Sequence, residues 1–144
     1  MRVDFYQLSR QPVEQVLPVI AGRLLDGGAR LVVVGDDDRL RRISQALWTS
    51  APTSFLAHAR AGEGMDEAQP ILLSSSCEAA NGATNIALAD GLWRDEALGF
   101  ARSFYFFDAE TIDGARAAWR ALARNEEAET HFWRQDGRKW VEGP

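Results

Sequence analysis

Leu31-Val32-Val33-Val34-Gly35-Asp36-Asp37-Asp38 is the stretch that decides the fold of this chain of 144 residues. Four consecutive apolar residues, three of them β-branched, are typical of a strand that is covered on both faces of its sheet. The glycine turns the chain, and the three acids suit the first turn of a helix, where they cap it and complement its dipole. A buried strand that leads directly into a helix predicts an α/β layer architecture.

The alternation of strand and helix continues on both sides of this stretch. Further strands are expected at 3–8, 71–73, 84–88 and 100–107, where β-branched and aromatic residues gather. Apolar residues at helical spacing predict three helices: one from Pro12 to Gly27-Gly28, one that buries Leu40, Ile43 and Leu47, and one from about Ala109 to Arg124. This order predicts a single domain over residues 1–144, a three-layer α/β/α fold with a mostly parallel sheet that resembles nucleotide-binding folds.

Four segments carry weaker patterns. Residues 49–69 are expected to form a long connection, and residues 74–83 an exposed turn. Residues 89–99 are not assigned to an element, and the aromatic and basic tail from Phe132 to Trp140 is expected to dock on the domain.

Composition excludes several classes of protein. Apolar residues make up 46% and charged residues 26%, which are ordinary values for a globular domain, and no run of 18 apolar residues occurs. The formal net charge of −5 argues against a protein whose whole surface grips DNA, so DNA contact is expected to be only indirect. Cys77 is the only cysteine, which fits a reducing compartment, and a cytoplasmic location is expected.

The sequence carries no strong catalytic or metal-binding motif. The loop at 35–38 lacks the further glycines of a dinucleotide fingerprint, and no Gly-Lys-Ser/Thr occurs. His58 and His131 are the only histidines, and neither has partners at metal-ligand spacing. Ser74-Ser75-Ser76-Cys77 lacks the surroundings of a nucleophile elbow. Neither a cofactor nor a metal is expected.

The segment from Ala46 to Gly64 indicates a protein-binding surface. Trp48 lies roughly 100° from Leu47 on the helical wheel and therefore leaves the core stripe of its helix. Phe55 and His58 follow in the connection after Pro52. Large aromatic side chains placed where core packing does not require them are typical of a surface that meets another protein.

A second candidate surface lies on the last long helix. Arg116, Arg120 and Arg124 recur at four-residue spacing and flank an apolar stripe of Ile112, Ala115, Trp119 and Leu122. An aromatic wall beside arginines suits a short peptide with acidic and apolar residues, or a terminal carboxylate. The structural alternative is an ordinary amphipathic helix whose arginines pair with Asp113, Glu126 or Glu127.

Ala46-Leu47-Trp48 and the run from Ser54 to Gly64 resemble the chi subunit family of bacterial DNA polymerase III, and the strands at 3–8 and 31–34 are similar to its first two. The resemblance covers essentially the whole chain and is strongest over about residues 1–64. It implies a non-catalytic accessory subunit of the polymerase III clamp-loader complex. Such proteins bind the acidic, phenylalanine-ended tail of single-stranded DNA-binding protein, and through a separate surface a psi subunit or an accessory helicase.

The resemblance assigns residues to both surfaces. It places Trp48, Phe55 and His58 on the psi or helicase surface. The tail site matches Tyr105, Arg116, Trp119 and Arg120. One basic position of that site falls on Ile112.

Two alternatives to this adaptor remain open on the sequence. A nucleotide-binding α/β enzyme or sensor, acting through loops at the carboxyl ends of the strands, is supported only by the architecture. Direct binding of single-stranded DNA through aromatic side chains is disfavoured by the net negative charge.

Overall fold

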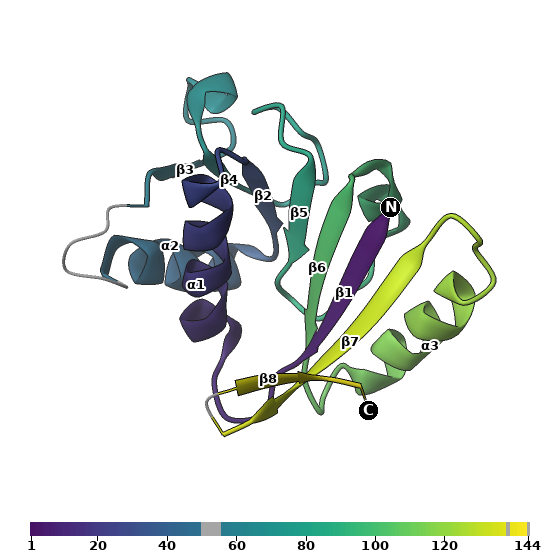
Figure 1. The fold of residues 1–144 in the computed structure, drawn as a ribbon. Coiled ribbons are helices and arrows are strands. Elements are labelled where there is room, and N and C mark those ends of the chain that lie inside the picture. Colours follow the sequence, from purple (N-terminus) through teal and green to yellow (C-terminus); the bar gives the residue numbers. More distant parts are fainter. Residues whose placement is uncertain (50–55, 138, 144) are drawn as a thin grey trace.

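The fold is built on one sheet, which a computed structural model describes for residues 1–49, 56–137 and 139–143. Within these ranges eight strands lie in the order β3-β4-β2-β5-β6-β1-β7-β8, and every neighbouring pair is parallel except β7 with β8 (Figure 1). The strands are β1 (Arg2–Gln7), β2 (Leu31–Val34), β3 (His58–Arg60), β4 (Ile71–Ser74), β5 (Asn85–Leu88), β6 (Arg102–Phe107), β7 (Glu129–Asp136) and β8 (Lys139–Glu142). The prediction of a mostly parallel α/β sheet is confirmed.

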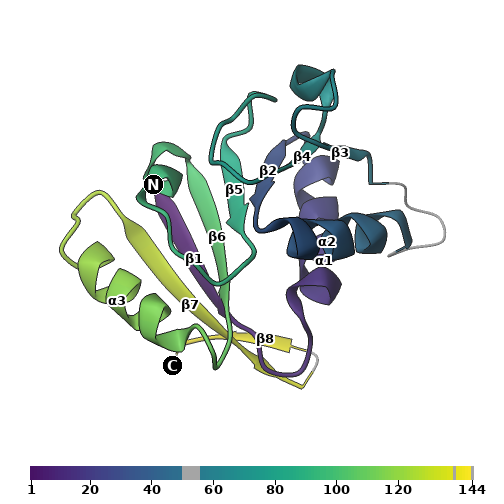
Figure 2. The ribbon, with the colours of Figure 1, turned by 180° about the vertical axis from the view of Figure 1, so that it is seen from behind.

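Helices cover both faces of the sheet. Helices α1 (Val13–Asp26) and α2 (Asp37–Thr49) pack on one face, and α3 (Ile112–Leu122) packs on the other. Figure 2, seen from behind, shows α3 on β7 and β1 at one end of the molecule, and α1 and α2 together at the other. Helices α1 and α2 lie in the connections from β1 to β2 and from β2 to β3, which run towards the β3 edge of the sheet, whereas α3 lies in the connection from β6 to β7, which runs in the opposite direction. Because such crossovers share one handedness, the reversal places α3 on the other face.

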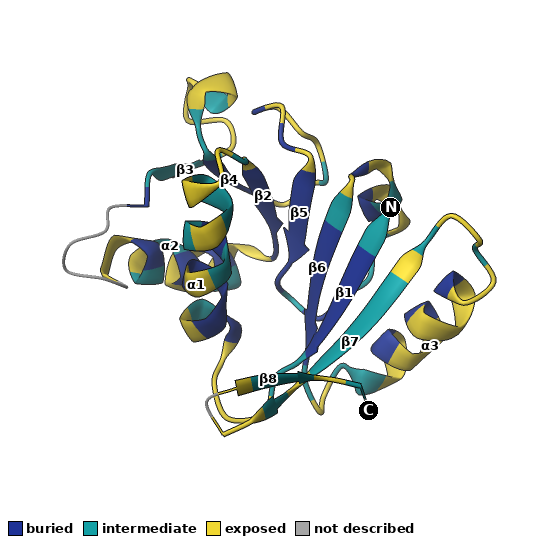
Figure 3. Ribbon diagram, viewed as in Figure 1, coloured by how far each residue is buried: buried dark blue, intermediate teal, exposed yellow. Residues whose placement is uncertain are grey.

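The core is divided by the sheet into two apolar clusters. Successive side chains of a strand point to opposite faces. Phe5 therefore joins the cluster beneath α3, while Tyr6 joins the cluster beneath α1 and α2. The central strands β2, β4 and β5 are buried along their whole length (Figure 3), as the continuous apolar run at 31–34 predicts.

Two segments hold more structure than the sequence suggests. The expected long connection at 49–69 contains the edge strand β3 and a short 3-10 helix, Asp66–Ala68. The segment at 74–83, expected to be an exposed turn, ends in the core. Its Asn81 is buried and donates to the carbonyl oxygens of Leu31 and Gln69, at 3.3 and 2.9 Å. Asn81 thus satisfies carbonyls at the amino ends of two strands, which residue composition does not reveal.

The chain after residue 100 also differs in detail from the prediction. The tail does dock on the domain, but as β7, beside β1, and as β8, which turns back along β7. Helix α3 begins at Ile112 and not near residue 109. Asp108 organises the preceding turn, because its carboxylate accepts from the backbone N–H groups of Glu110 and Thr111 at 3.0 and 3.1 Å. The unassigned stretch at 89–99 contains a 3-10 helix, Asp95–Gly99.

Candidate functional site

A pocket of about 440 Å³ lies between α3 and the strands β1, β6 and β7. It holds three of the residues that the sequence assigned to one site, together with six others. The lining residues are Phe5, Gln7, Phe107, Ile112, Ala115, Arg116, Trp119, Arg120 and Phe132.

Aromatic rings form the walls of this pocket. The Trp119 ring lies edge-on to Phe5, with centroids 5.1 Å apart, and edge-on to Phe132 at 6.1 Å. Phe107 packs against both phenylalanines, at 6.4 and 6.0 Å. The Trp119 side chain nevertheless remains 37% exposed. Its ring therefore has one part fixed against the sheet and another part open to an incoming apolar group.

Two arginines line the same pocket and are free to meet an anion. Arg116 approaches only Asp113, at 3.8 Å, and both side chains are largely exposed. Such a pair contributes little to stability. No ion pair joins Arg120 or Arg124 to an acid anywhere in the described ranges. The structural alternative, in which these arginines serve salt bridges along the helix, therefore accounts for at most Arg116.

Small residues on α3 set the depth of the pocket. Ala115 and Ala118 are buried against the sheet. A β-carbon added at Gly114 would lie 3.9 Å from the Tyr105 hydroxyl oxygen. Short side chains let the helix approach the strands closely at its first turns. The larger Trp119 forms the outer wall of the pocket and packs edge-on against Phe5.

Tyr105, expected in this site, lies beneath the pocket and does not line it. The side chain is fully buried, and its hydroxyl donates to the carbonyl oxygen of Gly91 at 2.9 Å. Burial raises the pKa of Tyr105 to about 12. Its ring supports Phe5 at 5.3 Å. Tyr105 therefore acts on the pocket through Phe5 in this structure, and a ligand in the pocket would not touch it.

The sequence missed the strand residues that complete the pocket. Phe5, Phe107 and Phe132 were assigned to strands or to the tail, without a role in binding. Only Phe107 ends its strand, at the edge where α/β sheets often bind ligands, whereas Phe5 and Phe132 lie within β1 and β7 and reach the pocket through the face of the sheet. Ile112, which stands at a usually basic position of the family resemblance, also lines the pocket and makes its mouth more apolar.

The second expected surface is centred on Trp48 and His58. The Trp48 side chain is 54% exposed, and its ring centre lies 5.0 Å from that of His58. His58 is held from both sides. Its Nδ1 lies 2.8 Å from the carbonyl oxygen of Leu56, and its Nε2 lies 2.8 Å from Ser44 Oγ. Since a carbonyl only accepts, Nδ1 carries the donated proton.

A shallow hollow of about 620 Å³ adjoins Trp48 along α2 and β3. An ion pair between Arg60 and Asp37, at 2.6 Å, crosses it. Because Asp37 engages Arg60, the acidic turn after β2 serves here to join α2 to the edge strand. Phe55, the third residue expected on this surface, lies outside the described residues.

The described part of the chain holds no cluster of three or more metal-ligating side chains. Within the same ranges, no helix is long and apolar enough to cross a membrane. What the geometry offers instead is an apolar pocket with arginines at its mouth and an exposed tryptophan at the opposite end of the sheet. Fold and site thus define a class: an α/β protein with two separated surfaces suited to binding other proteins.

The comparison with protein families assigns the chain within that class. The family model described as DNA polymerase III chi subunit, HolC, matches residues 1–130. The chain belongs to this family, and membership supports an accessory role in DNA replication as part of a DNA polymerase III complex. A search of curated proteins found no match to the chain.

Proposed function

We propose that this protein is a non-catalytic adaptor of the DNA polymerase III clamp-loader complex, and that its α3 pocket binds the acidic, phenylalanine-ended tail of single-stranded DNA-binding protein. The observation that supports this best is an aromatic-walled pocket lined by two arginines: Arg120 forms no ion pair within the described residues, and Arg116 forms only an exposed one with Asp113, at 3.8 Å. A terminal phenylalanine brings both an apolar ring and a carboxylate, so it matches both parts of the pocket.

Each lining group has a definite task in this proposal. The phenyl ring of the tail packs on the exposed part of the Trp119 ring, where stacked or edge-on aromatic contacts are favourable. Arg120 and Arg116 meet the terminal carboxylate and the acidic side chains, for which the guanidinium fork is suited. Ile112 replaces one cation of the family pattern with an apolar contact. We therefore expect binding that depends less on salt than a site with three or four cations would show.

A peptide titration tests this function. A labelled peptide ending in Asp-Asp-Ile-Pro-Phe should bind, and the Arg120→Ala variant should weaken binding about tenfold to a hundredfold, since a charge-assisted hydrogen bond contributes roughly 1.5–3 kcal/mol. Arg124→Ala is the matched control: it removes the same charge from an exposed position in the turn just after α3, outside the pocket. If both variants lost peptide affinity equally, the net positive charge of this surface would explain binding without a specific role for the pocket, which would contradict the proposal.

The Trp48 surface is proposed to bind a psi subunit or an accessory helicase. Its support is the exposed indole held against His58, beside the free edge of β3. Trp48→Ala should abolish co-purification with a co-expressed psi or helicase partner. Leu92→Ala, which removes an equally exposed apolar side chain elsewhere, should not. Undiminished co-purification of the Trp48→Ala variant would exclude this surface.

A nucleotide-binding enzyme or sensor is the competing function, and no feature of the site favours it. Thermal unfolding with nucleotides and divalent metals separates the two. Stabilisation that grows with nucleotide concentration would support the competing function, whereas stabilisation by the tail peptide alone supports the adaptor.

A further inference from the structure

A second concave site lies on the opposite face of the same strands. A groove of about 450 Å³ runs between α1 and the strands β1, β7 and β8. Figure 1 shows α1 over the β2 half of the sheet, so that β1 and β7 lie beside it without a helix of their own on this face. The groove is lined by Arg2, Tyr6, Gln11, Gln15, Val16, Val19, Ile20, Arg23, Arg102, Trp133, Gln135 and Trp140.

The charge of the lining is positive. Three arginines line the groove, and no Asp or Glu does so among the residues that the structure describes. Arg23 forms no ion pair within the described ranges, and Arg102 engages an acid through Nε alone, which leaves both of its terminal nitrogens to a ligand. Glu129 and Glu142 lie near the Arg2 end, where both contact His131. The Arg23 and Arg102 end is therefore the more attractive to an anion.

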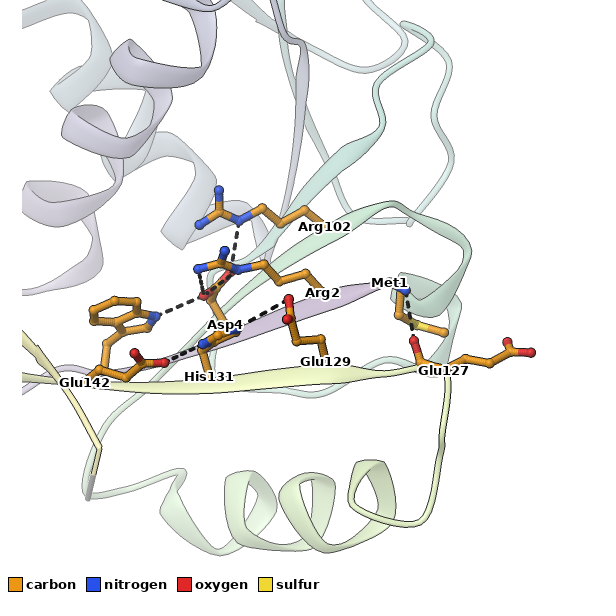
Figure 4. A network of polar contacts seen from close by, with 9 residues as sticks. Met1, Arg2, Asp4, Arg102, Glu127, Glu129, His131 and Glu142 are labelled. Carbon is orange, nitrogen blue, oxygen red and sulfur yellow. Dashed lines mark hydrogen bonds and ion pairs between the residues drawn. The ribbon is translucent and has the colours of Figure 1, made fainter.

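A buried carboxylate fixes this arrangement. Asp4 is fully buried and accepts from Arg2 at 3.1 Å, from Arg102 at 2.9 Å and from the indole N–H of Trp133 at 2.9 Å. Figure 4 shows the two guanidinium groups converging on Asp4 from the same side. Because Arg2 and Arg102 are held in place before a ligand arrives, less side-chain rotamer entropy is lost on binding.

Flat rings and neutral amides complete the groove. Tyr6 stacks on Trp133, with centroids 6.3 Å apart and planes within 17°, and Trp140 stands edge-on to Tyr6 at 5.1 Å. Both indoles are partly exposed. Gln135 and Gln11 are joined by a hydrogen bond of 2.7 Å, and each keeps further donor and acceptor capacity.

We propose that this groove binds a short segment of single-stranded DNA. Phosphates meet Arg23 and Arg102, and one or two bases stack on the indoles of Trp133 and Trp140, as in other single-strand binding grooves. An acidic peptide is the competing occupant. The neutral amides favour DNA, because base edges present both donors and acceptors, whereas carboxylates only accept.

This inference revises the expectation that the chain reaches DNA only indirectly. That expectation rested on the net charge of −5, which counts every charge equally. Folding places three arginines along one groove and leaves most of the acids elsewhere on the surface. The inference does not depend on the α3 pocket, which lies on the other face of the sheet.

Fluorescence anisotropy with a labelled oligothymidylate of about ten nucleotides tests the proposal, a length within the range of sites that single-strand binding proteins cover. At low salt the dissociation constant should fall within roughly 1–100 μM. Arg23→Gln should weaken binding about threefold to tenfold and reduce the salt dependence by about one phosphate contact. Arg120→Gln, in the α3 pocket, is the matched control and should leave DNA binding unchanged.

A charge pair at an exposed wall position strengthens the test. Val19 is 56% exposed on α1, so its replacement should not disturb the core. Val19→Glu should weaken DNA binding, and Val19→Lys should strengthen it. An oligomer of abasic nucleotides should bind more weakly than oligothymidylate if bases stack on Trp133 and Trp140.

Three results would overturn the proposal. One is the absence of binding at ~1 mM protein, a concentration ten times the weakest dissociation constant expected. Another is equal binding of Val19→Glu and Val19→Lys. The third is displacement of the oligonucleotide by an acidic peptide in the Arg120→Gln variant, which would assign the groove to a peptide. Failure of tail binding in the α3 pocket would leave each of these outcomes unaffected.

Discussion

Replacing Asp4 by Asn removes the charge on which three strands converge. Arg2 lies on β1 itself, Arg102 on β6 and Trp133 on β7, so the Asp4 carboxylate joins the central strand to both of its neighbours. An Asn side chain keeps one acceptor oxygen but turns an amide N–H₂ towards the donors. At least one guanidinium then loses its partner.

The cost follows from the burial of each partner. The Asp4 side chain is 0% exposed, while those of Arg2 and Arg102 are 37% and 33% exposed. Breaking a fully buried pair costs about 3–5 kcal/mol. Water screens the half-exposed arginines and reduces that value. We therefore expect Asp4→Asn to lower the free energy of unfolding by about 2–3 kcal/mol, and the melting temperature by roughly 6–10 °C for a domain of this size.

The pH dependence supplies a second readout. Burial acts to raise the pKa of Asp4, but hydrogen bonds from Arg2, Trp133 and Arg102 outweigh it and hold that pKa below its ordinary value. A carboxyl group with a lowered pKa stabilises the folded state above the unfolded-state pKa of about 3.9, and this stabilisation is lost as the pH falls through the folded-state pKa. The difference in the free energy of unfolding between the wild type and Asp4→Asn should therefore shrink as the pH is lowered.

Urea unfolding at pH 7 and at pH 3 measures both quantities. Asp4→Asn should lower the urea midpoint relative to wild type at pH 7, and by a smaller amount at pH 3, with an unchanged m value. Glu126→Gln, which neutralises an exposed acid outside this network, is the control. Equal midpoints for Asp4→Asn and wild type at pH 7 would refute the reasoning, because the network would then contribute nothing net.

Two further variants test the packing around the sheet. Gly91 adopts φ +79°, and an added β-carbon would lie 2.5–2.8 Å from Thr111, so Gly91→Ala should destabilise the fold by roughly 2–3 kcal/mol in denaturant titrations. A hydrogen bond to Glu142 raises the pKa of His131, burial opposes it, and Glu129 adds to the rise. The protonated imidazole therefore stabilises the folded state below an unfolded-state pKa of about 6.5, and this stabilisation is lost as pH rises through the folded-state pKa. His131→Gln should remove this pH dependence, which is below about 1 kcal/mol because both acids are exposed.

The sequence predicted the layers better than the edges. The continuous apolar run at 31–34 and the helical spacing of apolar residues on either side reflect which side chains are buried, and such patterns can be recognised locally. The assignment of these elements is confirmed. Strand β7 was missed because it lies near the edge of the sheet and is only half-buried, which mixes polar and aromatic residues without a clean alternation. Edge strand β3 has three residues and no apolar face. Both depend on pairing with a distant strand, which local pattern does not encode.

The candidate site divides in the same way. Arg116, Trp119 and Arg120 lie on one helix, so their spacing alone predicted that they share a face, and the pocket brings them together. Phe5 and Phe132 are 127 positions apart in sequence, and only the parallel pairing of β1 with β7 makes them neighbours. Helical sites can be read from spacing, whereas a site that spans strands requires the strand order.

Alternation along β1 and β7 has a consequence for function. Phe5 and Phe132 point into the α3 pocket, and the next residues, Tyr6 and Trp133, point into the groove on the opposite face. A ligand on either face therefore contacts the same two strands without touching a ligand on the other. The proposed tail and DNA segment can be bound simultaneously, and any coupling between them passes through the backbones of β1 and β7, which Asp4 joins to each other and to β6. Asp4→Asn should consequently alter such coupling, while Arg23→Gln should affect the DNA site alone.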